Sequence, residues 1–232
     1  MKNLTIGVLG GMGTYATIHL FKKYAEVFTA EKEWNRPRII IDNRCTMPSR
    51  VRAFLYNEKS EQLVDEMVDS MQSLVNSGCN RIILACNTAH LFLPKIYKKV
   101  PELEFRVINI ISNCVKQIKN DNVKEIYLLA SEGTIDSKIY QDVFEKEGIT
   151  CNVPKHNDYH LLRQCIEAVK QNIYTEEVKK AFLDLASRHD YILLGCTELP
   201  ILYEKYGVEI AGVVYDPLLL SLFKLKEEYD DD

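Results

Sequence analysis

Short apolar runs alternate with longer segments of mixed polarity along the 232 residues of the chain. The apolar runs are rich in β-branched residues and predict buried strands at 5–9, 38–42, 81–85, 105–109, 124–129, 190–195 and 209–214. Apolar positions at helical spacing predict helices at 14–28, 60–77, 160–172 and 216–229. The methionines of the second helix fall on its apolar face and are predicted to pack in the core. Alternating strands and helices are typical of an α/β fold with parallel sheets.

Two of the predicted strands end in nearly the same sequence. Each run stops at a small residue and then presents a cysteine and a threonine, in Arg81-Ile-Ile-Leu-Ala-Cys86-Asn-Thr88 and in Asp190-Tyr-Ile-Leu-Leu-Gly-Cys196-Thr197. Side chains just past a buried strand lie where open α/β sheets bind ligands, and a helix start there lowers the pKa of a thiol. We therefore predict that Cys86 and Cys196 form a functional pair. Buried cysteine commonly acts as a small hydrophobic residue, and four other cysteines are predicted to pack in the core in this way: Cys79, Cys114, Cys151 and Cys165.

A glycine loop also occurs twice, each time between a predicted strand and a helix. The two versions are Val8-Leu-Gly-Gly-Met-Gly13-Thr14 and Leu128-Leu-Ala-Ser-Glu-Gly133-Thr134. Each precedes its cysteine strand, so the order predicts two similar lobes related by an approximate twofold. We expect the first lobe to comprise 1–98 plus 209–232 and the second to comprise 99–208.

The composition narrows the class of protein. Basic and acidic residues are mixed, the net charge is −4, and no basic stripe marks a nucleic-acid surface. No apolar stretch approaches the ~20 residues of a membrane span, and the first residues lack a signal-peptide pattern. Seven cysteines without a CxxC motif argue against a disulfide framework and a zinc site. We expect a cytoplasmic protein with neither nucleic-acid nor membrane partners.

Other residues leave further chemistry open. The glycines of Gly7–Gly13 are spaced GxxGxxG, unlike the GxGxxG of dinucleotide-binding folds, although such a loop can hold any anion. Arg50 follows a turn-forming proline, and its guanidinium suits a bidentate grip on a carboxylate. On pattern alone Lys170 is a solvated helix lysine. His90 follows Cys86 by four residues, so a Cys–His hydrolase dyad stays open beside a capping or packing role.

Taken together, these motifs resemble the cofactor-independent aspartate/glutamate racemase superfamily, most closely its aspartate racemase branch. The matching pieces follow the family's order and span essentially the whole chain. They are Gly7-Val-Leu-Gly-Gly-Met-Gly13 with Ala16-Thr17, Pro48-Ser-Arg50, Ala85-Cys-Asn-Thr-Ala-His90, Ala130-Ser-Glu-Gly-Thr134 and Leu194-Gly-Cys-Thr-Glu-Leu-Pro200.

The resemblance implies an α/β fold of two pseudosymmetric three-layer lobes, each with a mostly parallel sheet, and an active site in the cleft between them. It implies a homodimer and racemisation of an acidic amino acid with neither a cofactor nor a metal. Cys86 and Cys196 would be the paired acid and base. Arg50 and Lys170 match groups that recognise the side-chain carboxylate. The other matching positions bind or cover the amino-acid group: Met12, Gly13, Asn87, Thr88, Thr134 and Thr197.

Several alternatives stay open at this point. Ser49 and Thr46 stand where the family has an aspartate and an amide, so the choice between aspartate, glutamate and larger substrates is undecided. A maleate-isomerase-like or hydantoin-racemase-like enzyme could use the same lobes, and a noncatalytic protein could bind an acidic metabolite. The neighbours of the two cysteines also differ, with Asn87 and His90 near the first and Glu198 near the second.

Overall fold

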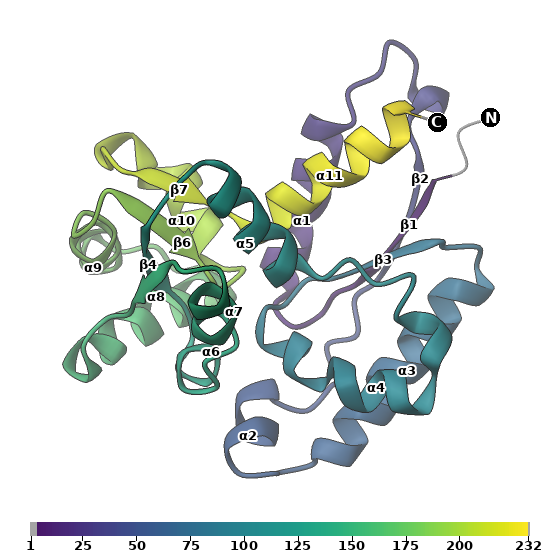
Figure 1. Cartoon of the computed structure of the whole chain (residues 1–232), viewed down its shortest axis with the longest axis horizontal. Coiled ribbons are helices and arrows are strands. Elements are labelled where there is room, and N and C mark those ends of the chain that lie inside the picture. Colours follow the sequence, from purple (N-terminus) through teal and green to yellow (C-terminus); the bar gives the residue numbers. More distant parts are fainter. Residues whose placement is uncertain (1–3, 232) are drawn as a thin grey trace. The chain divides into compact units, whose positions relative to one another are not determined.

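The computed structural model describes residues 4–231 and divides into two compact units (Figure 1). Unit 1 comprises Met1–Ile110 and Leu218–Asp232, and unit 2 comprises Ile111–Pro217. Each unit is built on a parallel sheet, as the sequence predicts. Among the described residues, no helix is both long and apolar enough to cross a membrane.

Unit 1 contains a three-stranded parallel sheet in the order β2-β1-β3. In Figure 1 its strands lie between α1 and α11 on one side and α3 and α4 on the other. The strands are β1 (Thr5–Leu9), β2 (Arg38–Asp42) and β3 (Arg81–Leu84). The helices are α1 (Thr14–Val27), α2 (Arg50–Leu55), α3 (Ser60–Asn76), α4 (Leu93–Lys99) and α11 (Pro217–Asp231), with short 3-10 turns at Glu33–Asn35, Thr88–Phe92 and Pro101–Leu103.

Unit 2 contains a four-stranded parallel sheet in the order β5-β4-β6-β7. Helix α8 packs on α9, α10 contacts both of them, and α7 packs beside β5. The strands are β4 (Glu125–Leu129), β5 (Thr150–Asn152), β6 (Tyr191–Leu194) and β7 (Val213–Tyr215). The helices are α5 (Ile110–Asn120), α6 (Glu132–Asp136), α7 (Gln141–Lys146), α8 (Tyr159–Gln171), α9 (Glu176–Ala186) and α10 (Leu199–Tyr206), with 3-10 turns at His156–Asp158 and Gly207–Glu209.

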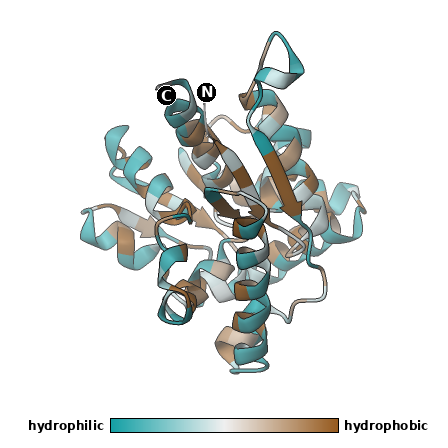
Figure 2. Cartoon of the chain, turned by 90° about the vertical axis from the view of Figure 1, so that its right-hand side faces the viewer, coloured by the Kyte–Doolittle hydropathy of each residue, from teal (hydrophilic) through white to brown (hydrophobic). Residues whose placement is uncertain are grey.

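Burial follows the sequence pattern in α3. Leu63, Met67, Met71 and Leu74 are all buried, so the prediction of core methionines is confirmed. The helix ends where Gly78 takes a positive φ of 94°, a conformation that glycine adopts without a Cβ clash. In Figure 2 hydrophobic colour gathers on the strands while much of the helical surface is hydrophilic, as expected for sheets covered by amphipathic helices.

The segment 105–109 is not the strand that its apolar residues predict. It makes one isolated bridge, between Ile82 and Val107, and follows a 3-10 turn at Pro101–Leu103. The side chain of Phe105 is 83% exposed, so the alternating residues do not form a buried face. The bridge between this segment and β3 therefore involves one β3 residue, Ile82.

The boundaries of the units differ from those expected. The predicted division lies after 98 and after 208, whereas the units divide after Ile110 and after Pro217. The predicted strand 209–214 begins with a 3-10 turn and becomes β7 only at Val213. Because β7 pairs with β6, it belongs to unit 2.

We expect Gly11→Ala to destabilise the protein more than Gly78→Ala. Both glycines have positive φ, 77° and 94°, so each alanine carries the cost of about 1–2 kcal/mol for a left-handed L residue. At Gly11 the added Cβ would also lie 2.3 Å from the backbone carbon of Arg44, whereas nothing lies within 4 Å at Gly78. Urea unfolding of both variants measures the difference. Equal losses of stability would contradict the tight approach of the two backbones.

Candidate active site

The two cysteine strands occupy equivalent places in their sheets. In unit 1, β3 pairs with β1, and the last pair in register is Leu9 with Leu84. In unit 2, β6 pairs with β4, and the last pair is Leu129 with Leu194. In both sheets the chain places the next strand on one side of the central strand and the cysteine strand on the other. Such a switch point is where open parallel sheets form ligand crevices.

The equivalence continues one residue past each strand. Ala85 N donates to Leu9 O at 2.9 Å, and Gly195 N donates to Leu129 O at 2.7 Å. The next residue is the cysteine in both units. Each unit therefore brings one cysteine beside the loop that follows its central strand.

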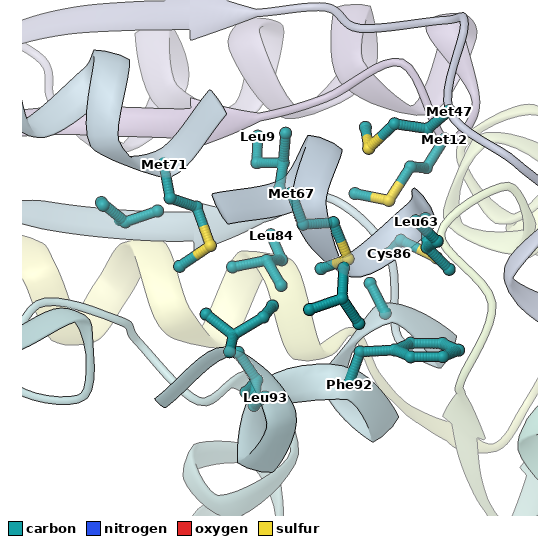
Figure 3. Close-up of a cluster of buried hydrophobic side chains, with 14 of the residues drawn as sticks. Leu9, Met12, Met47, Leu63, Met67, Met71, Leu84, Cys86, Phe92 and Leu93 are labelled. Carbon is teal, nitrogen blue, oxygen red and sulfur yellow. The ribbon is translucent and has the colours of Figure 1, made fainter. Parts of the chain in front are cut away.

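Cys86 lies at the edge of a cluster of buried apolar side chains (Figure 3). Its side chain is 8% exposed, and the cluster also contains Met12, Met47, Met67 and Phe92. Met12 thus belongs to the predicted site through the glycine loop and to the core through its side chain. Sulfur-rich, apolar surroundings exclude water from one side of the thiol.

His90 bonds the backbone of Cys86 and not its thiol. Its Nδ1 lies 3.0 Å from Cys86 O, and this nitrogen must carry the proton because a carbonyl oxygen only accepts. Burial lowers the pKa of His90 to about 4, although hydrogen bonds to the backbone of Cys86, Ile108 and Asn87 oppose the shift. The neutral ring therefore shapes the chain after Cys86. The geometry does not support a Cys–His hydrolase dyad.

The expected helix start after Cys86 is a 3-10 turn, Thr88–Phe92, and α4 begins only at Leu93. After Cys196, helix α10 begins at Leu199. The helix-terminus argument for the thiols therefore does not apply equally to the two units. What the units share is the strand end.

His90 is expected to make the protein sensitive to acid. Its folded pKa of about 4 lies below the ordinary 6.5, so the unfolded chain takes up the proton first as pH falls. The stability gained from the neutral ring is complete above pH 6.5 and is lost as pH falls toward about 4, at most about 3 kcal/mol. Urea unfolding at about pH 7.5 and about pH 5 should show a smaller drop for His90→Gln than for wild type. The exposed-site variant His156→Gln should keep the wild-type drop; an equal drop in His90→Gln would contradict this assignment.

Arg50 ties the loop before α2 to the glycine loop. Its Nη2 donates to Met12 O at 2.9 Å and its Nη1 donates to Pro48 O at 3.1 Å. Its Nε is buried and has no hydrogen-bond partner among the described residues. The guanidinium is thus held in place by backbone oxygens and retains donor capacity.

The two neighbouring arginines, Arg44 and Arg52, each form an ion pair with a carboxylate. Arg44 bonds Asp69 and the backbone of α3 at Glu66. Arg52 bonds Glu58 at 2.6 Å. Of Arg44, Arg50 and Arg52, Arg50 alone has no carboxylate partner among the described residues.

Thr17 fixes the shape of the glycine loop, a role that the sequence pattern did not reveal. Its Oγ1 accepts from Gly11 N at 3.2 Å and donates to Gly13 O at 3.0 Å. A Cβ on Gly10 would meet this side chain at 2.6 Å. The available signal was a threonine on the otherwise apolar face of α1. Asn87 and Thr88 are buried directly after Cys86.

Cys196 has a carboxylate beside its thiol. Its side chain is partly exposed, and Sγ donates to Glu198 Oε2 at 3.0 Å. Thr197 Oγ1 donates to the same oxygen at 3.4 Å. Both Thr197 and Glu198 are buried. The two cysteines therefore have different surroundings, apolar at Cys86 and anionic at Cys196.

Thr134 and Lys170 complete the predicted set in unit 2. Thr134 is fully buried at the start of α6, with its hydroxyl 3.1 Å from that of Ser131. Lys170 lies exposed on α8 and pairs with Glu167 at 2.9 Å. Burial alone would lower the pKa of Lys170, but Glu167, Glu198 and Cys196 raise it above its usual value. The pKa of Lys170 is therefore raised in part by the charges of Cys196 and its neighbour Glu198.

The other cysteines differ from this pair. Cys79, Cys114 and Cys165 are buried as predicted, whereas Cys151 is partly exposed. Burial raises the pKa of both Cys151 and Cys165 to about 12. Cys45 is exposed and accepts from Asn43. Among residues 4–231, no group of three or more His, Cys, Asp or Glu side chains could hold a metal ion.

Two parallel sheets, each with a cysteine shortly after a strand that pairs with the first strand of its unit, give an α/β fold that agrees with the amino-acid racemase class. A family model described as Asp/Glu/Hydantoin racemase matches residues 9–220, and the chain belongs to this family.

Individual relatives agree with this assignment. The chain is 27% identical over 213 residues to the broad specificity amino-acid racemase RacX of Bacillus subtilis, covering 88% of this chain and 90% of that protein. It superposes on Picrophilus torridus aspartate racemase with a TM-score of 0.81 at 26% identity, over 97% of this chain and 94% of the other. An aspartate racemase homologue from Pyrococcus horikoshii shares the fold, with a TM-score of 0.76 at 23% identity over 99% and 100% of the two chains.

Proposed function

We propose that this protein racemises acidic amino acids without a cofactor, with Cys86 and Cys196 as its two proton-transfer groups. The observation that carries the proposal is the equivalent position of the two cysteines, each two residues past the end of a strand that pairs with the first strand of its unit. Two matched thiols suit a reaction that removes a proton on one face of a carbon and returns one on the other. Membership of the racemase family supports the same reaction.

In one direction the Cys86 thiolate takes the α-proton. The Cα–H bond breaks, an S–H bond forms, and the electron pair moves into an enolate-like carboxylate. The Cys196 thiol then gives its proton to the opposite face of the carbon. In the other direction the two cysteines exchange roles. The buried polar residues of the predicted set would supply hydrogen bonds to the intermediate: Asn87, Thr88, Thr134 and Thr197.

Arg50 supports a substrate with a side-chain carboxylate. It lies beside the glycine loop, it is oriented by two backbone oxygens, and it retains donors for a carboxylate. Lys170 would be a second basic group in unit 2, although it already pairs with Glu167. The similarity to an aspartate racemase favours aspartate, and the similarity to a broad specificity racemase favours a wider range.

The proposal also includes the cellular compartment and the oligomeric state of the enzyme. The structure gives no disulfide among the seven cysteines at positions 45–196, which suits a reducing cytoplasm that keeps the two catalytic thiols reduced. A homodimer remains a prediction from the family resemblance, and sedimentation or light scattering of the purified protein tests it.

Proton NMR in deuterated water tests the reaction. The protein is incubated with L-aspartate, L-glutamate and a neutral amino acid such as L-alanine. Loss of the α-proton signal together with appearance of the D-enantiomer is expected for the acidic amino acids. Saturable binding of aspartate or glutamate without exchange would instead indicate a noncatalytic binding protein. Conversion of maleate without amino-acid exchange would indicate an isomerase of the same fold.

A further inference from the structure

The side chain of Glu198 turns back onto the thiol two residues before it. Its Oε2 accepts from Cys196 Sγ at 3.0 Å and from Thr197 Oγ1 at 3.4 Å. The Glu198 side chain is 2% exposed, and its Oε1 is buried without a hydrogen-bond partner among the described residues. A buried carboxylate with so few partners is costly, so its place beside the thiol calls for a function.

The charges that face this pair come from two helices. Glu198 precedes α10, and α10 packs on α8, which carries Lys170 and Glu167. Lys170 is coupled electrostatically to both Glu198 and Cys196. The Lys170 side chain is 39% exposed and paired with Glu167, so partial access of solvent and the Glu167 charge weaken its effect on the thiol. Glu198 is in direct hydrogen-bond contact with the Cys196 thiol, whereas Lys170 acts on it through space.

We propose that Glu198 is a positioning residue that holds the proton on Cys196, so that the resting protein carries a thiol at Cys196. A negative carboxylate at 3.0 Å accepts the S–H hydrogen bond and disfavours a second negative charge on sulfur. Among residues 4–231 no carboxylate is hydrogen-bonded to the Cys86 thiol, which borders a cluster of apolar side chains. The inference rests on the proposed racemase function for its consequence: Cys196 donates a proton before it accepts one.

The proposed preference for a protonated Cys196 would have a defined effect on the kinetics. The two enantiomers have equal free energies in water, so kcat/KM must be equal in the two directions in any variant. Glu198 therefore cannot change the stereochemical outcome. It can make the two kcat values unequal, with matching differences in KM, because it disfavours the bound state in which Cys196 is a thiolate. In Glu198→Gln the two kcat values are expected to approach each other.

The direct test is alkylation of Cys196 as a function of pH, which needs no racemase activity. Iodoacetamide reacts with the thiolate, and trypsin then releases Cys196 in the peptide 189–205 and Cys86 in the peptide 82–95, each with a single cysteine. The variants are Glu198→Gln and Glu198→Asp, with Glu204→Gln as the matched charge control. Glu204 lies exposed on the same helix. Circular dichroism verifies that each variant is folded.

The midpoint of the Cys196 profile is expected to fall by about one pH unit or more in Glu198→Gln, so that alkylation below the midpoint accelerates about tenfold. Glu198→Asp keeps the charge one methylene further away and should shift the midpoint in the same direction by less. Glu204→Gln should leave it in place, and the Cys86 profile should not follow that of Cys196.

An unchanged midpoint in Glu198→Gln overturns the proposal. A rise overturns it as well, since it would mean that a protonated Glu198 donates to a thiolate. If the glutamine variant does not fold, the aspartate variant decides: no downward shift rejects the proposal. A downward shift in a protein that fails to exchange the α-proton would reject the racemase function while supporting the role of Glu198 at the thiol.

Discussion

Cys86→Ser and Cys196→Ser are each expected to lower racemisation by about 10³-fold or more. A serine hydroxyl is a far weaker acid than a thiol, so it can neither form the base nor deliver the proton at neutral pH, and general acid–base groups typically contribute 10²–10⁴-fold. Because both cysteines are needed in each direction, neither variant should retain turnover of one enantiomer. Chiral chromatography of D- and L-aspartate measures the loss.

The same variants should separate the two halves of the reaction. Each keeps one working thiol, so each can exchange the α-proton of one enantiomer with deuterated water without racemising it. The two variants are expected to choose opposite enantiomers. Cys151→Ser is the matched control, because Cys151 lies on β5, away from the junction of β4 and β6. Full racemase activity in either catalytic variant would reject the two-base mechanism.

Arg50→Ala is expected to reduce kcat/KM for aspartate and glutamate by about 10²-fold or more. The loss combines a charge-assisted hydrogen bond to the substrate carboxylate with the cost of leaving that carboxylate unpaired in a partly buried site. Arg50→Lys should recover little of the activity, because an ammonium cannot reproduce the planar fork. Arg52→Ala is the control, since this exposed arginine pairs with Glu58.

Arg50 also bonds the backbone of Met12 and Pro48, so its removal could disturb the glycine loop as well as substrate binding. The kinetic experiment must therefore distinguish recognition of the substrate carboxylate from structural support of that loop. A structural role would lower turnover of every substrate equally. A recognition role lowers turnover of acidic amino acids more than that of alanine. Unchanged kinetics with aspartate and glutamate would place the carboxylate-binding group elsewhere in the protein.

Much of the fold could be predicted from local pattern. β1 and β2 match their predicted bounds, and α3 ends at Asn76, shortly before the predicted C-terminal glycine Gly78. These elements are defined by neighbours within one segment, so periodicity and capping suffice. The segment 105–109 was predicted wrongly, because an apolar run does not by itself provide a strand partner. β7 was predicted late in the chain, but its pairing with β6 decided which unit it joins.

The same distinction between local sequence pattern and tertiary contacts applies to the candidate site. The sequence alone determined that two cysteines follow two similar strands, because strand ends and small residues are local features. Only the tertiary structure decided which groups surround them. It left Arg50 available by pairing Arg44 and Arg52, and it directed His90 to a backbone carbonyl.

It also gave the two thiols unlike surroundings, with methionines near Cys86 and a carboxylate on Cys196. Choices of this kind depend on contacts between residues far apart in the chain and on side-chain direction, which no local periodicity encodes.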